Sequence, residues 1–383
     1  MTKKHGELNS HEGEKHSISV DSVEFGPEGL DYSAVLNEFG IDYIKNELAQ
    51  LKLGKKELPP VFRRGIVFAH RDLGRIVDCM IHKKPFAVVT GVNPSGQLHF
   101  GNKLIIDQAL FYQEHGADVF IPISDDETFV FGKIDSLEKA LKNAYDYVIP
   151  DLIALGLKPG KTKIFISTKT SRAYRLAVKL SRRATFSMIK AIFGFNNETP
   201  PGQIFYGVMQ SSHITFPQLE EFGGPKPVVV PVGIDQDPYI RLSRDIADKE
   251  GFIKPSSTYH QFMLGLRGGK MSGSKPESCI FLTDTPEVGA KKIMSAITGG
   301  QGSAEEQRKK GANPDVCAVY DYYRMHLAES DKHLERVREE CKAGKRLCGD
   351  CKKEAAELMK KFLKEHHAKR EKAKKEIKRF MIE

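Results

Sequence analysis

Two short segments carry the residues whose types could do chemistry. Residues 94–102 read PSGQLHFGN, and residues 270–275 read KMSGSK. The first follows an apolar run at residues 85–91 and opens a run with helical spacing, which predicts a strand, a turn and a helix. The free N–H groups and positive dipole end at such a helix start attract anions. The second offers lysines and hydroxyls, which are groups that bind polyphosphates. Together the two segments predict a polyphosphate site.

Within the first segment, each residue type suits the binding of a polyphosphate. Pro94 fixes the turn, and Gly96 lets the backbone approach a ligand without an intervening side chain. His99 lies at the helix start, where its imidazole can donate to a phosphate oxygen. Gly101 leaves room for a flat ring against the helix. Taken alone, the segment could equally be a strand–turn–helix corner with a surface histidine, so its meaning depends on the second segment.

The second segment has the features of a mobile phosphate-binding loop. The flexible ammonium of Lys270 can follow negative charge onto a departing diphosphate. Ser272 and Ser274 add hydroxyl donors. Gly268 and Gly269 precede the segment and supply hinge freedom for a loop that closes over its ligand. The alternative is an exposed basic turn, which the presence of the first segment disfavours.

Alternating strands and helices must position these segments. We expect strands at residues 85–91, 117–123, 163–167 and 227–232, and helices at residues 137–157, 172–193 and 238–250. Such alternation predicts an α/β fold with a mostly parallel, doubly wound sheet. Ligands bind such sheets at the carboxyl ends of the strands. The first segment follows one strand end, and residues 233–245 follow another.

The pattern divides the chain into three parts. Residues 1–64 are an extension that we expect to be disordered over residues 1–20 and helical over about 30–53. Residues 65–284 hold the alternating pattern. Residues 285–383 read as helices alone, at residues 286–298, 316–327, 331–338 and 352–381. We therefore place a domain boundary near residue 284.

Composition excludes several classes of protein. The 383 residues are 40% hydrophobic and 28% charged, which fits a water-soluble protein of two or more domains. No stretch approaches the roughly 20 apolar residues of a membrane span, and the N-terminus lacks the apolar core of a signal peptide. Six cysteines are too few for a disulfide scaffold. We expect a reduced, cytoplasmic protein that does not bind membranes.

Positive charge is concentrated at the C-terminus. The chain has a net charge of +9, and residues 331–383 contain 18 Lys or Arg against 11 Asp or Glu. Such asymmetry favours a polyanionic partner, with nucleic acid first. The alternative is a solvated basic helix that binds nothing.

The two opening segments, in this order, resemble the HIGH and KMSKS signatures of class I aminoacyl-tRNA synthetases. Residues 233–245, which read GIDQDPYIRLSRD, resemble the archaeal and eukaryotic type of tryptophanyl-tRNA synthetase, as do AIFGF at residues 191–195 and FLTD at residues 281–284. The resemblance runs from about residue 65 to the C-terminus.

The resemblance implies an activity and its partners. It implies ATP-dependent attachment of L-tryptophan to tRNA(Trp) through a tryptophanyl-adenylate, with Mg²⁺ carried by the ATP phosphates. It also implies a homodimer, a Rossmann-like catalytic domain at residues 65–284 with a helical insertion and the dimer interface, and an anticodon-binding domain at residues 285–383. Activation of a carboxylate by ATP needs positioning and charge stabilisation rather than a protein nucleophile.

The resemblance also implies residue roles. Catalytic roles fall to His99, Lys270 and Ser272. The residues implied to bind ATP are Gly91, Pro94, His99, Gly101, Asn102, Asp235, Lys270, Met271 and Ser272. Those implied to bind tryptophan are Glu127, Tyr206, Gln210 and Gln236. Among them Asp235 would contact the ribose, Gln210 the α-amino group and Gln236 the main-chain groups of the amino acid.

The chain departs from the family pattern at the signatures. Asn102 stands where a second histidine is usual, and it cannot carry charge near neutral pH. Gly273 stands where many relatives have a second lysine, although Lys275 lies two positions on. These departures keep a second hypothesis open, that of a tRNA-binding paralogue with weakened catalysis. A third hypothesis, a small-molecule adenylyltransferase on the same fold, is disfavoured by the basic helical C-terminal part.

Two further departures concern substrate choice. Val89 and Pro122 stand where eukaryotic relatives have polar groups that bind the indole N–H. An unpaired buried donor costs about 1–3 kcal/mol, so the indole N–H needs another acceptor, and the candidates are Ser124, Asp125 and Asp126. A tyrosyl-tRNA synthetase is therefore the alternative within the family. Residues 233–245 favour tryptophan.

The cysteines near the C-terminus raise the question of a metal site. Cys341, Cys348 and Cys351 could bind zinc with His366 or His367 as a fourth ligand. A second Cys-x-x-Cys pair is missing, however, and the helical context does not suit a zinc ribbon. We therefore expect no protein-bound metal.

Overall fold

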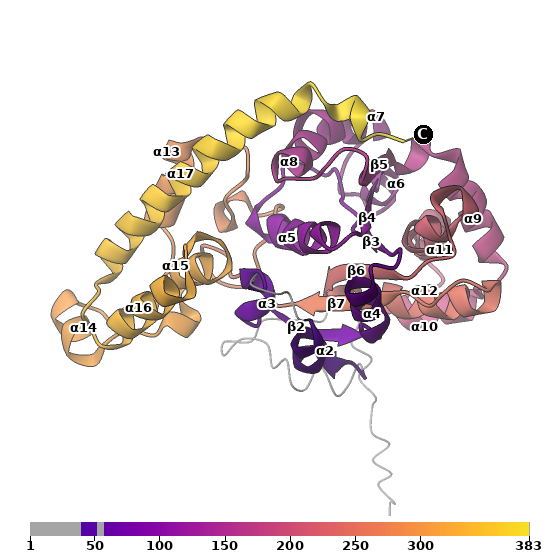
Figure 1. The fold of residues 1–383 in the computed structure, drawn as a ribbon. Helices are drawn as coiled ribbons and strands as arrows, with labels where there is room; N and C mark the ends of the chain where they lie inside the picture. The colour runs from indigo at the N-terminus through magenta and orange to yellow at the C-terminus, as the bar shows by residue number, and fades with distance from the viewer. Residues whose placement is uncertain (1–39, 52–56, 383) are drawn as a thin grey trace, which may run out of the picture.

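The computed structural model describes residues 40–51 and 57–382. The disorder expected over residues 1–20 lies outside these residues, and so do residues 30–39 and 52–53 of the helix expected over 30–53. A seven-stranded sheet forms the centre of the described chain, in the order β1-β2-β7-β6-β3-β4-β5 (Figure 1). The strands are β1 Asp42–Tyr43, β2 Val67–Arg71, β3 Ala87–Val89, β4 Asp118–Ile123, β5 Thr162–Ile166, β6 Val228–Gly233 and β7 Ser256–His260.

Strands β7, β6, β3, β4 and β5 run parallel, which confirms the predicted doubly wound sheet. The two N-terminal strands extend it in antiparallel fashion, β2 on β7 and β1 on β2. The helix expected through residues 42–43 is wrong, because Asp42 and Tyr43 pair with His70 and Ala69 of β2. Tertiary pairing overrides the local helical spacing there. Helical structure begins only at α2, Lys45–Gln50.

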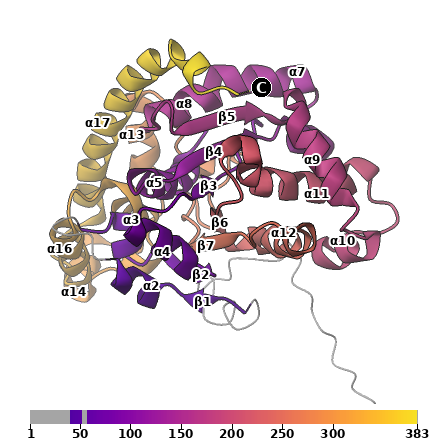
Figure 2. The same cartoon turned by 45° about the vertical axis from the view of Figure 1, so that its right-hand side comes forward.

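Helices cover both faces of the sheet (Figures 1 and 2). Alternate strand residues serve two separate cores: Val88 and Ile121 belong to one, whereas Val89 and Phe120 belong to the other. This is the two-residue period of a strand buried on both sides. Residues of α4 Gly74–His82, α5 Phe100–Glu114 and α8 Ile149–Ala154 pack into the first core. The second core takes residues of α9 Ser171–Ser181, α10 Phe186–Phe193, α11 Pro201–Thr215 and α12 Asp237–Glu250.

Three further helices lie in the part of the chain before residue 284. They are α3 Pro60–Arg63, α6 Asp125–Val130 and α7 Leu137–Asn143. A π-helical turn at Ala144–Val148 joins α7 to α8. The helix expected over residues 137–157 is therefore present over residues 137–154, with a π-helical turn in its middle.

Residues after 284 form helices, as predicted. They are α13 Pro286–Met294, α14 Ala304–Lys310, α15 Ala318–Tyr322, α16 Asp331–Lys342 and α17 Cys348–Lys374. The long α17 runs from the neighbourhood of α16 back to α8 (Figure 1). Its buried Met359 and Leu363 belong to the same apolar core as α5 and α8. Beyond α17 the chain reaches the sheet, where Ile382 N donates to the Ile164 carbonyl at 2.9 Å.

Candidate active site

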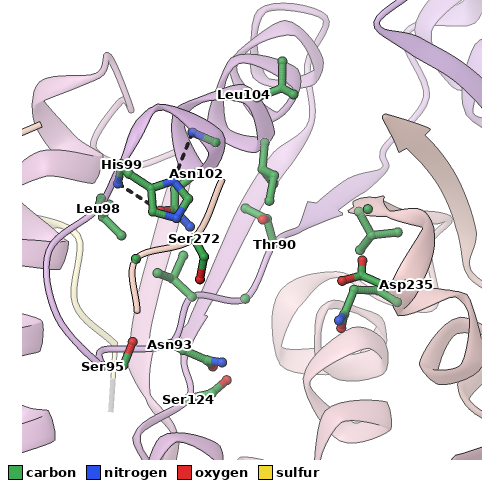
Figure 3. Close-up of a pocket in the computed structure, with 18 of the residues that line it drawn as sticks. Thr90, Asn93, Ser95, Leu98, His99, Asn102, Leu104, Ser124, Asp235 and Ser272 are labelled. Carbon is green, nitrogen blue, oxygen red and sulfur yellow. Dashed lines mark hydrogen bonds between the residues drawn. The ribbon is translucent and has the colours of Figure 1, made fainter. Parts of the chain in front are cut away.

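A cavity of about 920 Å³ opens at the carboxyl ends of β3, β4 and β6. Its walls come from the turn after β3, the start of α5, helices α6 and α11, the turn after β6 and the loop at residues 270–274. The two segments singled out in the sequence thus meet across one space. Figure 3 shows His99, Asn102, Ser272 and Asp235 around it.

Hydrogen bonds fix His99 at the start of α5. The His99 backbone N–H donates to Asn102 Oδ1 at 3.0 Å, and the Gly101 N–H donates to His99 Nδ1 at 3.1 Å. This is a reciprocal cap of the helix N-terminus. Asn102 therefore has a structural role that sequence reasoning missed: its amide oxygen holds the backbone of the signature histidine.

Burial sets the charge of His99, and the cap sets which ring nitrogen carries the proton. Burial, followed by the charge of Lys270, lowers the pKa of His99 to about 4. The imidazole is therefore neutral near pH 7. Since Nδ1 accepts a hydrogen bond, the ring proton lies on Nε2. The side chain is a neutral donor, which suits contact with a phosphate oxygen.

Gly101 is required by the histidine itself. A Cβ at this position would lie 2.9 Å from His99 Cε1 and 3.0 Å from Nδ1. Real Cβ atoms do not approach other atoms this closely, so a side chain here would push the ring out of its capping position. The sequence suggested that Gly101 makes room for a ligand ring. The structure adds that it makes room for His99.

The lysine of the second segment is held by the residue expected to contact ribose. Lys270 Nζ lies 2.8 Å from Asp235 Oδ2 and 3.9 Å from the centre of the Phe262 ring. Asp235 follows β6, where a Cβ on Gly233 would lie 2.6 Å from Asp235 Oδ1. The glycine therefore allows the carboxylate to turn back over the strand end.

The loop that carries Lys270 contacts the first segment. A backbone bridge pairs Leu264 with Lys270, and Met271 N donates to the Met263 carbonyl at 3.0 Å. The Cβ position of Gly273 lies 3.4 Å from His99 Cδ2. The glycine thus lets the loop backbone pass beside the histidine ring. Ser272 and Ser274 share a hydrogen bond of 2.8 Å between their hydroxyls.

At the other end of the cavity, Glu127 lies in a polar cluster. Its Oε1 accepts from Asn93 Nδ2 at 2.8 Å and from Lys133 Nζ at 2.9 Å. Sequence reasoning missed Asn93 and Lys133, although both line the cavity. The position of Asn93, immediately before Pro94 in the turn after β3, was the signal that could have identified it.

Helix α11 supplies the next wall. Tyr206 and Gln210 both line the cavity, as their four-residue spacing predicts. Burial, followed by the charge of Glu127, raises the pKa of Tyr206 well above its ordinary value. The phenol is therefore a neutral hydroxyl. His213, one turn further and also missed, is buried with Nε2 3.0 Å from Ser167 Oγ, and burial lowers its pKa to about 4.

The three candidate acceptors for the indole N–H differ in whether they line the cavity. Ser124 lines the cavity, whereas Asp125 and Asp126 do not. Asp125 accepts from the Thr168 N–H at 3.0 Å, and Asp126 accepts from Ser167 Oγ at 2.6 Å. The two carboxylates are thus buried in contacts with the chain after β5.

Most residues singled out in the sequence come together here. The cavity is lined by Gly91, His99, Gly101, Asn102, Glu127, Tyr206, Gln210, Asp235, Gln236, Lys270, Met271 and Ser272. Pro94 does not line it; its carbonyl accepts from Asn143 Nδ2 at 3.2 Å, which anchors the turn. Val89 and Pro122 do line the cavity, in an apolar region with Ile214 and Val230.

Comparison with known proteins identifies the family. The family described as tRNA synthetases class I (W and Y) matches residues 82–364. The tryptophan–tRNA ligase of Methanocaldococcus jannaschii is 46% identical over 91% of this chain and 94% of that protein. The enzyme of the same description from Archaeoglobus fulgidus is 40% identical over 89% and 95%.

A solved structure shows the same fold. The crystal structure of tryptophanyl-tRNA synthetase from Aeropyrum pernix K1 aligns with a TM-score of 0.86 at 40% identity, over 92% of this chain and 96% of that one. The family indicated by the signature segments is thereby confirmed. This chain belongs to the tryptophanyl-tRNA synthetases of class I.

Proposed function

We propose that the cavity activates L-tryptophan with ATP, and that the chain then transfers it to tRNA(Trp). The tryptophan carboxylate attacks the α-phosphorus in line and pyrophosphate leaves. A terminal hydroxyl of the tRNA then attacks the carbonyl carbon of the adenylate, and AMP leaves as the ester forms. The observation that carries the proposal is the meeting of His99, Asp235 and Lys270 around one cavity. The relatives, which are tryptophan–tRNA ligases, support it, and nothing in the comparisons favours tyrosine.

Around the nucleotide, we assign roles by chemistry and position. The neutral His99 donates its Nε2 proton to a phosphate oxygen, and Asp235 accepts from the ribose hydroxyls. Lys270 leaves Asp235 and follows charge onto the departing pyrophosphate, with Ser272 as a further donor. Gly91, Gly101, Asn102 and Met271 shape the walls against the nucleotide. These contacts stabilise charge and fix geometry, which is what this reaction needs.

Magnesium would arrive with the ATP phosphates. Among the residues that the structure describes, no group of three or more His, Cys, Asp or Glu side chains is placed to hold a metal ion. Mg²⁺ commonly keeps several waters and binds through substrate phosphates with one or two carboxylates rather than in an all-protein cage.

The end of the cavity opposite the nucleotide-binding residues fits the amino acid. Gln210 and Gln236 bind the main-chain groups, and the indole lies against the apolar region that includes Val89 and Pro122. Glu127 and Tyr206 border that space. Of the three acceptor candidates we favour Ser124 for the indole N–H, since it alone of them lines the cavity.

The remaining parts concern tRNA and assembly. We propose that the basic helices after residue 284 form the anticodon-binding domain, because residues 331–383 carry an excess of positive charge. We further propose a homodimer that acts in the cytoplasm. In the described residues, no helix has the length and apolar character that a bilayer crossing requires.

Pyrophosphate exchange with single amino acids tests the substrate. We expect ATP-dependent exchange with tryptophan and little with tyrosine. Exchange with tyrosine alone would overturn the substrate, and binding of tRNA without exchange for any amino acid would favour the weakened paralogue.

Substitution of the signature lysine tests the mechanism. Lys270→Ala should slow adenylate formation by about 100-fold or more while tryptophan affinity changes little. Lys275→Ala is a matched control in the same loop, since Lys275 does not line the cavity, and it should have a much smaller effect. Equal loss of tryptophan binding and adenylate formation in Lys270→Ala would contradict the role given to Lys270.

A further inference from the structure

Helix α11 presents one more polar side chain to the cavity. His213 lies three residues after Gln210, on the same face of the helix, and it lines the cavity. It is only 2% exposed. None of the contacts proposed for ATP or for the main-chain groups of tryptophan involves it. A buried imidazole in the wall of a binding cavity is costly unless its nitrogens find partners.

His213 borders the apolar region of the cavity. The centre of its ring lies 5.7 Å from that of Phe165 in β5, and Phe165 pairs with Pro122 in β4. Val89 in β3 pairs with Phe120, two residues before Pro122, so these strand residues share one face of the sheet. The side chains of Val89 and Pro122 have no polar atom. His213 therefore brings a polar group to a part of the cavity where the strands offer none.

A chain of hydrogen bonds fixes which nitrogen of His213 carries the proton. Ser167 Oγ donates its one proton to Asp126 Oδ2 at 2.6 Å, so at its 3.0 Å contact with His213 Nε2 the hydroxyl accepts. Asp126 also accepts from the Glu127 N–H and the Tyr174 hydroxyl, which oppose the effect of burial on its pKa. Burial lowers the pKa of His213 to about 4, so the ring is neutral. Its proton lies on Nε2, and Nδ1 has a free lone pair.

The Nδ1 atom of His213 is open to the cavity. Within the described part of the chain, no hydrogen bond reaches this atom, and it is not among the unpaired atoms that the protein encloses completely. His82 and His115, by contrast, direct Nδ1 to the carbonyl four residues earlier in their own helices. The cavity wall thus presents a neutral acceptor whose direction is fixed from behind.

We propose that His213 Nδ1 accepts the indole N–H of tryptophan and selects tryptophan through this bond. The inference rests on the proposed function and names the group that recognises the substrate. Indole is an apolar double ring with a single N–H donor, which matches an apolar region with a single fixed acceptor. Ser124 is the best placed of the acceptors that the sequence suggests. Its hydroxyl can rotate, however, and it also interacts with the Tyr206 side chain.

A tryptophan analogue without the N–H tests this recognition in the full-length chain. In 3-(3-benzothienyl)alanine a sulfur replaces the N–H and the double ring is otherwise similar. Affinity for both amino acids is measured by calorimetry, and pyrophosphate exchange is measured with each. The chain contains no tryptophan, so the fluorescence of the added amino acid reports its binding independently. We expect a preference for tryptophan of about 10- to 100-fold.

Variants of His213 assign the preference to one atom. His213→Phe keeps an aromatic ring without an acceptor, and the preference should fall to within about threefold, mainly through weaker binding of tryptophan. His213→Asn places an amide oxygen near the position of Nδ1 and should keep much of the preference. It also replaces His213→Phe if circular dichroism shows that the latter is unfolded, and loss of the preference in His213→Asn would then count against the proposal. The matched control is His115→Phe, because His115 does not line the cavity, and it should change neither quantity.

Ser124→Ala tests the rival acceptor. Whatever its effect on the rate, this variant should keep the preference for tryptophan. Full preference in folded His213→Phe, or loss of the preference in Ser124→Ala, would overturn the role given to His213. Binding of tryptophan with the expected preference but without exchange would contradict the proposed function alone. Exchange in which the unmodified chain uses tryptophan and the analogue equally would contradict the acceptor alone.

Discussion

At the scale of single residues, the site depends on a histidine that is held by its neighbours. Gly101 and Asn102 both fix His99, one by leaving space for the ring and one by capping its backbone. The departure at Asn102 from the usual signature therefore keeps the helix start intact. It does not by itself indicate lost catalysis.

Gly101→Ala should separate this positioning from general stability. The added Cβ would meet the His99 ring at 2.9 Å and displace it, so tryptophan-dependent pyrophosphate exchange should fall by about tenfold or more. Gly74→Ala is the control, since its Cβ meets nothing within 4 Å, and exchange should be unchanged. Similar exchange rates in the two variants would show that the ring position is unimportant.

The sequence could identify the site residues that stand within a recognisable motif. His99, Lys270 and Asp235 stand in recognisable segments, and the structure brings them together. His213 lies outside such segments, and only the folded chain shows that it lines the cavity, whereas Asn93 directly precedes the first segment. For the same reason the sequence could not separate Ser124 from the adjacent aspartates, because burial of Asp125 depends on contacts with the distant Thr168.

At the scale of elements, the apolar strands were predictable and one polar strand was not. Strands β3 to β6 are apolar runs buried on both faces, which the sequence shows directly. Strand β7, Ser256–His260, is equally buried yet mostly polar. Its polar groups find hydrogen-bond partners: Thr258 Oγ1 donates to Gln108 Oε1 of α5 at 3.1 Å, and within the strand Ser257 Oγ donates to Tyr259 Oη at 2.8 Å. Hydrogen bonds replace the apolar pattern, so no local signal marks the strand.

A buried carboxylate joins α17 to α8 in addition to their apolar packing. Asp151 Oδ1 accepts from His366 Nε2 at 3.0 Å and from Arg370 Nε at 2.8 Å, and the Asp151 side chain is fully buried. Asp151→Asn should lower the free energy of unfolding by about 3 kcal/mol, because it leaves the largely buried guanidinium of Arg370 without its charged partner. Denaturant unfolding measures this.

A surface pair on the same helix provides the control for α17. Lys361 and Glu329 lie 3.9 Å apart and are both 66% exposed. Lys361→Met should change the free energy of unfolding by no more than about 0.5 kcal/mol. If Asp151→Asn changes the free energy of unfolding as little as Lys361→Met does, α17 is held by apolar packing alone.

At the scale of the whole molecule, buried neutral histidines should make stability depend on pH. Burial lowers the pKa of His99 and His213 to about 4 and that of His260 to about 3. In the unfolded chain these groups titrate near 6.5. Below that pH the unfolded chain binds protons that the folded chain does not, so stability is complete above about pH 6.5 and is lost as the pH falls. Burial raises the pKa of Asp125 and Asp126, which act in the opposite direction.

A histidine variant isolates this effect from the opposing carboxylates. His260 Nδ1 accepts from Gln108 Nε2 at 3.2 Å, and the glutamine oxygen in His260→Gln can accept the same bond. Each buried histidine contributes up to about 1.4 kcal/mol per pH unit below its unfolded pKa. Between about pH 7 and pH 5, His260→Gln should therefore lose about 1 to 2 kcal/mol less than the unmodified chain. Denaturant unfolding at the two pH values measures the difference, and equal losses would mean that His260 takes up its proton in the folded protein.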